Sequence, residues 1–323
     1  MSAPKLSIVI PLLDEAANVR ALLDRLYPVL EAMDLPFEVV AVDDGSSDPT
    51  LALLLQEQKE RPGLCVVSFA RNFGQHAAVM AGFAEARGEW IVTLDADLQN
   101  PPEEIPRVVA ALREGHDLVN TWRENRQDTA FRRRASQLTN RVIRAWSGIE
   151  LRDFGCMLRG YHRSVVLPML QRPEIQTFIP ALATLHARNP TEIAVRHAER
   201  AHGASAYSLR RLLSLQLDLL ASFSVVPLRL LFVLGIGIAA AGVGFGLFLL
   251  AMRLFLGSEW AAEGVFTLFA VLFVFVGAQF VAFGLLGEYV GRIFQYVRER
   301  PAYLIQARYP QAKGPTGSEA TRP

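Results

Sequence analysis

Two kinds of residue are scarce in this sequence of 323 residues. Cysteine occurs only at Cys65 and Cys156, too far apart for a paired zinc motif and too few for a disulfide-stabilised scaffold. We interpret both as reduced, buried thiols. Lysine occurs only at Lys5, Lys59 and Lys313, so arginine carries most of the positive charge. Arginine suits bidentate recognition of phosphate groups.

Further absences narrow the function. The formal net charge is +1, so no strong overall field favours binding to nucleic acid. The sequence has no G-x-G-x-x-G after its first predicted strand and no G-x-x-x-x-G-K-[ST], so the motifs of dinucleotide-binding and P-loop proteins are missing. The first apolar stretch, residues 6–11, is too short for a secretory signal and runs into Asp14 and Glu15. We therefore expect the catalytic part of the chain to stay in the cytoplasm.

Short apolar runs alternate with segments of helical periodicity in the N-terminal part of the chain. Strands are predicted at residues 6–11, 37–42, 64–70, 90–94 and 116–122. Alternation at this spacing predicts an α/β fold, with a doubly wound and mainly parallel sheet of the Rossmann-like kind.

Acidic and amide side chains follow two of these strands where each strand ends. Asp43, Asp44 and Asp48 follow the second strand, and Asp95, Asp97 and Gln99 follow the fourth. Open α/β sheets bind ligands just beyond the carboxyl ends of their strands. Hard oxygen ligands there suit Mg²⁺ or Mn²⁺ bridging a diphosphate. A lone Asp-x-Asp is more often a solvated acidic turn, so the prediction depends on the surrounding motifs.

The C-terminal part contains two long apolar runs. Residues 230–252 would form a helix of about 34 Å, enough to span a bilayer. Residues 264–287 form the second predicted span. Arginines flank the pair, so the positive-inside rule places both termini in the cytoplasm. Residues 209–226 are predicted to be an amphipathic helix at the membrane surface, with a core helix of the preceding domain as the alternative.

These patterns divide the chain into five parts. In order, we expect a catalytic domain, an interfacial helix, a two-helix transmembrane hairpin, a juxtamembrane segment and a disordered tail. Their predicted bounds are residues 1–208, 209–226, 227–288, 289–309 and 310–323.

Several motifs together resemble the polyprenyl-phosphate glycosyltransferases of family 2, which have the GT-A fold. The broad family pattern is Val42-Asp-Asp-Gly-Ser-Ser-Asp48 and Thr93-Leu-Asp-Ala-Asp-Leu-Gln99. More specific are Arg71-Asn-Phe-Gly-Gln-His-Ala-Ala78 and Asp153-Phe-Gly-Cys-Met-Leu-Arg159. The resemblance covers nearly the whole chain. It is strongest to the branch that transfers the pentose 4-deoxy-4-formamido-L-arabinose to undecaprenyl phosphate for lipid A modification and resistance to polymyxin and other cationic peptides.

The resemblance implies which residues bind the sugar donor. Pro11, Glu15 and Asp44 would hold the uridine, and Asp95 would lie by the ribose and diphosphate. The metal, Mg²⁺ or Mn²⁺, would be bound by Asp97 and Gln99.

The resemblance also implies a catalytic set and an acceptor site. Arg123 would contact phosphate in the active site and Asp153 would lie near the donor sugar, both acting with Asp97. The phosphate of the lipid acceptor would be received by Arg132, Ser136 and Arg200.

The implied reaction is an inverting, metal-dependent transfer from a UDP-sugar to undecaprenyl phosphate at the cytoplasmic face of a bacterial inner membrane. Transfer of glucose or mannose to the same lipid is the alternative. Glycine-rich spans, and relatives that form tetramers, lead us to expect a homotetramer.

One motif departs from the family pattern, and three other classes of protein are alternatives to this family. Gly203-Ala-Ser-Ala-Tyr207 stands where the family has Gly-Glu-Ser-Lys-Tyr, so Ala206 replaces a lysine that would face the diphosphate. Either an arginine substitutes, or diphosphate binding differs, or the donor differs. A haloacid-dehalogenase-type phosphatase needs Thr or Val just after its Asp-x-Asp and a later lysine, whereas Leu98 follows here and no lysine occurs between Lys59 and Lys313. A processive polysaccharide synthase normally has Gln-x-x-Arg-Trp, which this sequence lacks. A non-enzymatic membrane scaffold would bind no UDP.

Overall fold

The computed structural model describes residues 3–123, 152–153, 155–171, 179–196, 226–256, 265–297 and 303–310. The chain divides into two compact units. The first contains residues 1–144, 148–207 and 301–323, and the second contains residues 145–147 and 208–300.

An eight-stranded sheet forms the centre of the first unit, with the order β7-β5-β6-β4-β1-β2-β3-β8. The strands are β1 (Leu6–Leu12), β2 (Phe37–Asp43), β3 (Leu64–Phe69), β4 (Trp90–Thr93), β5 (Leu118–Arg123), β6 (Arg159–His162), β7 (Pro190–Val195) and β8 (Ile305–Tyr309). β6 runs antiparallel to β4 and β5, and β8 runs antiparallel to β3, whereas the other pairings are parallel. The predicted α/β class is confirmed, and the sheet is mixed, with two antiparallel strands that the sequence analysis did not predict.

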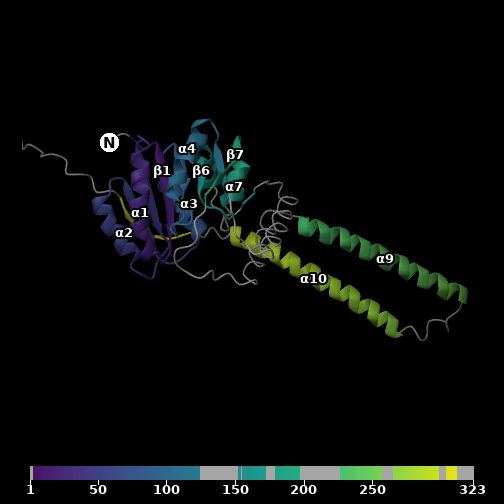
Figure 1. Ribbon diagram of the computed structural model, residues 1–323. Helices are drawn as coiled ribbons and strands as arrows, with labels where there is room; N and C mark the ends of the chain where they lie inside the picture. Colours follow the sequence, from purple (N-terminus) through teal and green to yellow (C-terminus); the bar gives the residue numbers. More distant parts are fainter. Residues whose placement is uncertain are drawn as a thin grey trace, which may run out of the picture. The chain divides into compact units, whose positions relative to one another are not determined.

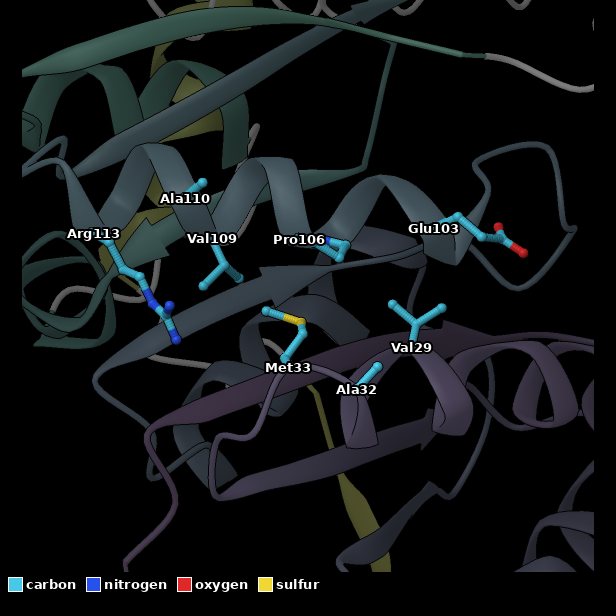
Figure 2. A pocket seen from close by; sticks show the side chains of 8 residues that line it. All are labelled: Val29, Ala32, Met33, Glu103, Pro106, Val109, Ala110 and Arg113. Atoms are coloured by element: carbon cyan, nitrogen blue, oxygen red, sulfur yellow. The ribbon is translucent and has the colours of Figure 1, made fainter.

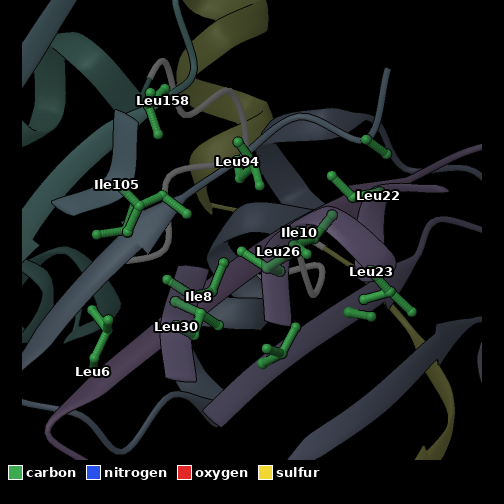
Figure 3. Close-up of a cluster of buried hydrophobic side chains, with 14 of the residues drawn as sticks. Leu6, Ile8, Ile10, Leu22, Leu23, Leu26, Leu30, Leu94, Ile105 and Leu158 are labelled. Carbon is green, nitrogen blue, oxygen red and sulfur yellow. The ribbon is translucent and has the colours of Figure 1, made fainter. Parts of the chain in front are cut away.

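Helices cover both faces of this sheet (Figure 1). Along β1, Leu6, Ile8 and Ile10 belong to one buried cluster and Val9 belongs to the other, as the alternation of a strand requires. Figure 3 shows the first cluster, in which leucines of α1 lie beside those residues of β1. The helices of this face are α1 (Ala16–Glu31), α2 (Thr50–Glu60) and α4 (Ile105–Arg113), preceded by the short η1 (Pro102–Glu104).

The opposite face is covered by α3 (Gln75–Glu85), α6 (Arg163–Gln171) and α7 (Ile179–His186). α3 packs directly on β1, because a Cβ built on Gly82 would lie 2.2 Å from Cγ1 of Val9. A larger residue at this position would push the helix away from the sheet. This close packing holds α3 against the sheet, and the helix begins at Gln75, shortly after β3 ends.

The chain leaves the sheet and returns to it at the same end. β7 runs parallel to β5, and Val195 at its end lies opposite Arg123 at the end of β5. β8 starts at Ile305, opposite Phe69 at the end of β3. Both points lie at the carboxyl end of the parallel strands. Residues 305–309, expected within a juxtamembrane segment, are therefore an edge strand of the sheet.

The second unit contains two long helices, α9 (Val226–Leu256) and α10 (Val265–Val297). They approach each other at Gly242, where a Cβ would lie 2.5 Å from Cζ of Phe275. In the described part of the chain one stretch, Val274–Gly291 in α10, is long and apolar enough to cross a membrane. α9 contains a shorter apolar stretch, Val233–Gly242, so the crossing by both helices stays a prediction. Residues 209–225 of the predicted interfacial helix lie outside the described residues.

Candidate active site

The loops after β1 and β2 are joined by reciprocal hydrogen bonds. Oδ1 of Asp14 accepts from the N–H (2.7 Å) and the hydroxyl (3.1 Å) of Ser47, and the N–H of Asp14 donates to Oγ of Ser46 (3.0 Å). Asp14 has φ 52°, a left-handed conformation that Asp tolerates better than most residues. Pro11 lies within β1, and Glu15 follows this loop and precedes α1. The loop that carries Glu15 and the loop that carries Asp44 are thus held together by hydrogen bonds.

Asp44 joins this structure to the loop after β3. Its carboxylate is buried and accepts hydrogen bonds from the N–H groups of Phe73 (2.7 Å) and Gly74 (2.9 Å). Burial raises the pKa of Asp44, although the two N–H donors act in the opposite direction. Gly45 has φ +70°, and a Cβ there would lie 2.4 Å from the carbonyl carbon of Arg71, so only glycine fits this crossing.

Asp95 lies beyond β4 and is held by two amide side chains. Gln75 Nε2 donates to its Oδ1 (2.6 Å) and Asn100 Nδ2 donates to its Oδ2 (3.2 Å). Burial, together with the neighbouring charge of Asp97, raises the pKa of Asp95 to about 7. Glu15 and Arg123 also act on Asp95 electrostatically. The residues that follow β1, β4 and β5 therefore meet at one end of the sheet.

Asp97 and Gln99 are the residues that could hold a divalent cation. Gln99 N–H donates to Oδ1 of Asp97 (3.1 Å), and Leu98 between them has φ 61°, an uncommon conformation for a leucine. Within the described residues, no three His, Cys, Asp or Glu side chains form a metal-binding cluster. One carboxylate and one amide oxygen suit Mg²⁺ or Mn²⁺ if diphosphate oxygens and water complete the shell. The donor set fits such a cation.

Arg123 and Asp153 form a bidentate ion pair beside these carboxylates. Nε and Nη2 of Arg123 donate to the two carboxylate oxygens of Asp153 at 2.6 and 3.0 Å. The Gly155 N–H also donates to Asp153, at 2.9 Å. The structure thus brings together two predicted catalytic residues that are 30 positions apart in the chain.

Not every predicted residue can be placed. The predicted acceptor residues Arg132, Ser136 and Arg200, and the departure at Ala206, lie outside the described residues. Conversely, the sequence analysis assigned no role to Asp14, Gln75 or Asn100, which hold the predicted site together. Gln75 belongs to the Arg71–Ala78 motif, and that motif was the available signal for it.

A pocket of about 430 Å³ lies between α1 and α4, with Glu103 of η1 among its lining residues (Figure 2). Val29, Met33, Pro106 and Val109 supply much of its apolar lining. None of its lining residues belongs to the strand-end clusters that contain Asp44 and Asp95.

Comparison with known proteins agrees with this geometry. The family model for Glycosyl transferase family 2 matches residues 7–167. Undecaprenyl-phosphate 4-deoxy-4-formamido-L-arabinose transferase of Edwardsiella ictaluri is 52% identical over 302 residues, 93% of each chain. The transferase of the same name from Serratia proteamaculans is 50% identical over 94% of this chain and 93% of its own.

Solved structures show the same fold at low identity. Glucosyl-3-phosphoglycerate synthase of Mycobacterium tuberculosis matches with a TM-score of 0.50 and 22% identity, over 68% of this chain and 78% of its own. Its complex with Mn²⁺, UDP and phosphoglyceric acid also gives 0.50, with 21% identity, over 68% and 76%.

The mixed sheet, with carboxylates gathered at its strand ends, and these relatives define the class of the protein, which is a glycosyltransferase with a GT-A-like fold. The chain belongs to family 2 of the glycosyltransferases, in the group of polyprenyl-phosphate glycosyltransferases. The predicted family is confirmed.

Proposed function

We propose that this protein transfers 4-deoxy-4-formamido-L-arabinose from UDP to undecaprenyl phosphate, with inversion and with a divalent cation, for the modification of lipid A. Relatives of 50–52% identity that carry this activity in their names support the sugar and the lipid. The observation that carries the proposal is the convergence of Glu15, Asp44, Asp95 and Asp97 with Arg123 at one end of the sheet.

The donor would lie along the carboxyl ends of β1, β2 and β4. Pro11, Glu15 and Asp44 would hold the uridine, and Asp95 would face the ribose and diphosphate. Asp97 and Gln99 would hold Mg²⁺ or Mn²⁺, which would neutralise charge on the diphosphate. Glucosyl-3-phosphoglycerate synthase, which has the same fold, forms a complex with Mn²⁺ and UDP, and this supports the choice of ligands.

The reaction does not require a strong general base. The nucleophile is an oxygen of the lipid phosphate. A phosphate monoester has a second pKa of about 6, so the lipid phosphate is largely ionised at neutral pH. The main task of the site is to stabilise the charge that develops on the departing UDP. Arg123, fixed by Asp153, supplies positive charge for this task, and a single displacement would invert the anomeric carbon.

The acceptor would reach the same end of the sheet. Arg132, Ser136 and Arg200 would receive its phosphate, as the family resemblance implies. The chain leaves the sheet at Val195 for the helical unit and returns at Ile305, and both points lie at this end. We propose that α9 and α10 both span the bacterial inner membrane with both termini cytoplasmic, after an interfacial helix at 209–226, and that the protein is a homotetramer.

A donor panel tests the proposal. The full chain in detergent would receive UDP-linked formamido-arabinose, glucose or mannose with a short polyprenyl phosphate, and mass spectrometry would identify the lipid product. We expect the formamido-arabinose product to dominate. A dominant glucosyl or mannosyl product would favour the alternative donor, to which the departure at Ala206 would then correspond. No transfer to lipid phosphate from any donor would contradict the proposal.

A further inference from the structure

Arg159, the first residue of β6, is a fully buried arginine that neither the predicted site nor the proposed mechanism uses. Its side chain is 0% exposed and donates to three oxygens that carry no charge. Nε donates to the carbonyl of Cys156 (2.8 Å), Nη2 donates to the carbonyl of Asp153 (2.9 Å), and Nη1 donates to Oδ1 of Asn120. Burying a charge costs several kcal/mol, and the fork of donors on arginine is what satisfies all three acceptors here.

Two of these acceptors are backbone groups of the segment that carries Asp153. On one side, the Asp153 carboxylate binds Arg123 through two hydrogen bonds. On the other side, the Cys156 thiol lies 3.6 Å from Oδ1 of Asn100, whose amide donates to Asp95. The guanidinium of Arg159 therefore fixes a backbone segment that contacts both sides of the site. Asp153 of this segment binds Arg123, and Cys156 contacts Asn100.

We propose that Arg159 is a positioning residue of the transfer reaction. It holds the carbonyl groups of Asp153 and Cys156, and thereby sets the Arg123–Asp153 ion pair and Asn100 relative to Asp95. Arg159 itself touches no reacting group. The inference rests on the proposed function, because that function gives Arg123, Asp153 and Asp95 their roles.

Arg163 offers a matched control. It lies four positions further on and also binds backbone carbonyls, since its Nη1 donates to Ala86 (2.8 Å) and Gly88 (3.3 Å). These acceptors precede β4, whereas Asp95 follows it, so Arg163 acts at the other end of the sheet. Arg159→Lys and Arg163→Lys each keep the charge and remove the fork. Arg159 is fully buried and Arg163 is only partly buried, so a merely structural role predicts a larger loss of Tm in Arg159→Lys but an unchanged kcat of its folded fraction.

The test compares the two variants of the full chain by steady-state kinetics and by hydrogen exchange of a peptide covering residues 153–158. We expect Arg159→Lys to lower kcat about 100-fold, the size of loss that a displacement of about 1 Å produces. Exchange of the peptide should become faster in this variant. Arg163→Lys should change neither quantity by more than about twofold. Equal kcat values in the two variants, or unchanged exchange in Arg159→Lys, would overturn the proposal.

Asn120 supplies a second route if Arg159→Lys does not fold. Asn120→Ala keeps Arg159 and its two backbone acceptors but removes the third, so we expect about a tenfold loss of kcat, as for groups that orient a binding residue. Asn120→Asp keeps an acceptor and should recover most of the activity. An unchanged kcat in Asn120→Ala would contradict the inference. Exchange is measured without substrate, so it shows whether Arg159 holds residues 153–158 even if wild-type protein transfers no sugar and the proposed function fails.

Discussion

Two fully buried carboxylates at opposite ends of the sheet, Glu38 and Asp44, are compensated in different ways. At the amino end, Glu38 is 2% exposed and accepts two hydrogen bonds from the guanidinium of Arg87, at 2.8 and 2.6 Å. At the carboxyl end, Asp44 is also 2% exposed, but its donors are the backbone N–H groups of Phe73 and Gly74. Asp95 similarly accepts from two side-chain amides.

We infer from this difference that the carboxyl end is the end that binds a ligand. A guanidinium both orients a carboxylate and cancels its charge, whereas N–H and amide donors orient it and leave the charge in place. Burial raises the pKa of Asp44 and of Asp95, so the carboxyl end holds negative charge at a cost in free energy. Groups strained in this way are typical of functional sites. We infer that a cation relieves the strain when the donor binds.

The largest expected effect comes from Asp97 at the carboxyl end. Asp97→Asn keeps the size of the side chain but removes its charge, so we expect kcat/KM to fall about 1,000-fold, or about 4 kcal/mol of transition-state stabilisation. Thermal stability should change little, because Asp97 is only partly buried. Steady-state kinetics with saturating metal measure the loss. Activity within tenfold of wild type would remove Asp97 from the site.

Asp44→Asn tests the buried carboxylate of the same end. One of the two N–H groups, of Phe73 or Gly74, would then face an NH₂ group instead of an oxygen. We expect the KM for the UDP-sugar to rise about 10- to 100-fold, which corresponds to about 1.4–2.7 kcal/mol of binding. Kinetics as a function of donor concentration measure this change. A fall in kcat at unchanged KM would argue against a role in nucleotide binding.

Glu38→Gln is the corresponding change at the amino end. It removes the charge-assisted pair between the buried carboxylate of Glu38 and the exposed guanidinium of Arg87, and we expect a loss of about 2 kcal/mol in the free energy of unfolding. The kcat of the folded variant should equal that of wild type. Thermal or denaturant unfolding checks the first expectation and kinetics check the second. A loss of kcat in the folded variant would contradict the assignment of function to the carboxyl end alone.

The smallest effect concerns pH and His76, at the start of α3. Burial, together with the charge of Arg159, lowers the pKa of His76 from 6.5 to about 4. The unfolded chain therefore binds this proton more readily, so the stability from neutral His76 is full above pH 6.5 and is lost as the pH falls toward 4. We expect the drop in Tm between pH 7.5 and 5 to be about 2–4 °C smaller in His76→Gln. An identical drop would contradict the lowered pKa.

Much of the central sheet could be predicted from local pattern. β1 to β5 are apolar runs followed by turn or acidic residues, which is the signal of a buried parallel strand. β6 is short and begins with Arg159, so nothing in its composition predicts a buried strand. β8 pairs with β3 from more than 200 positions away, as in Ile305 opposite Phe69, and such a partner cannot be found from local periodicity.

The residues of the candidate site also fall into two groups, those that could be predicted from the sequence and those that could not. The positions of Asp44, Asp95 and Asp97 at strand ends were predictable because carboxylates after apolar runs are a chemical signal in the sequence, and their roles in binding stay predictions. Gln75 and Asn100 were not, because an amide gains its role only from the carboxylate that it contacts in the folded chain. The acceptor residues came only from the family resemblance and remain predictions.

Calorimetry of UDP binding tests the central claim most directly. UDP would be titrated into the full chain with Mn²⁺ and again with the cation chelated, for wild type, Asp97→Asn and Glu38→Gln. We predict that chelation weakens binding to wild type and to Glu38→Gln by at least about tenfold, or 1.4 kcal/mol, and that Asp97→Asn binds UDP weakly in both conditions. Equal affinity with and without the cation, unchanged in Asp97→Asn, would show that the carboxyl-end carboxylates do not hold a metal and a nucleotide.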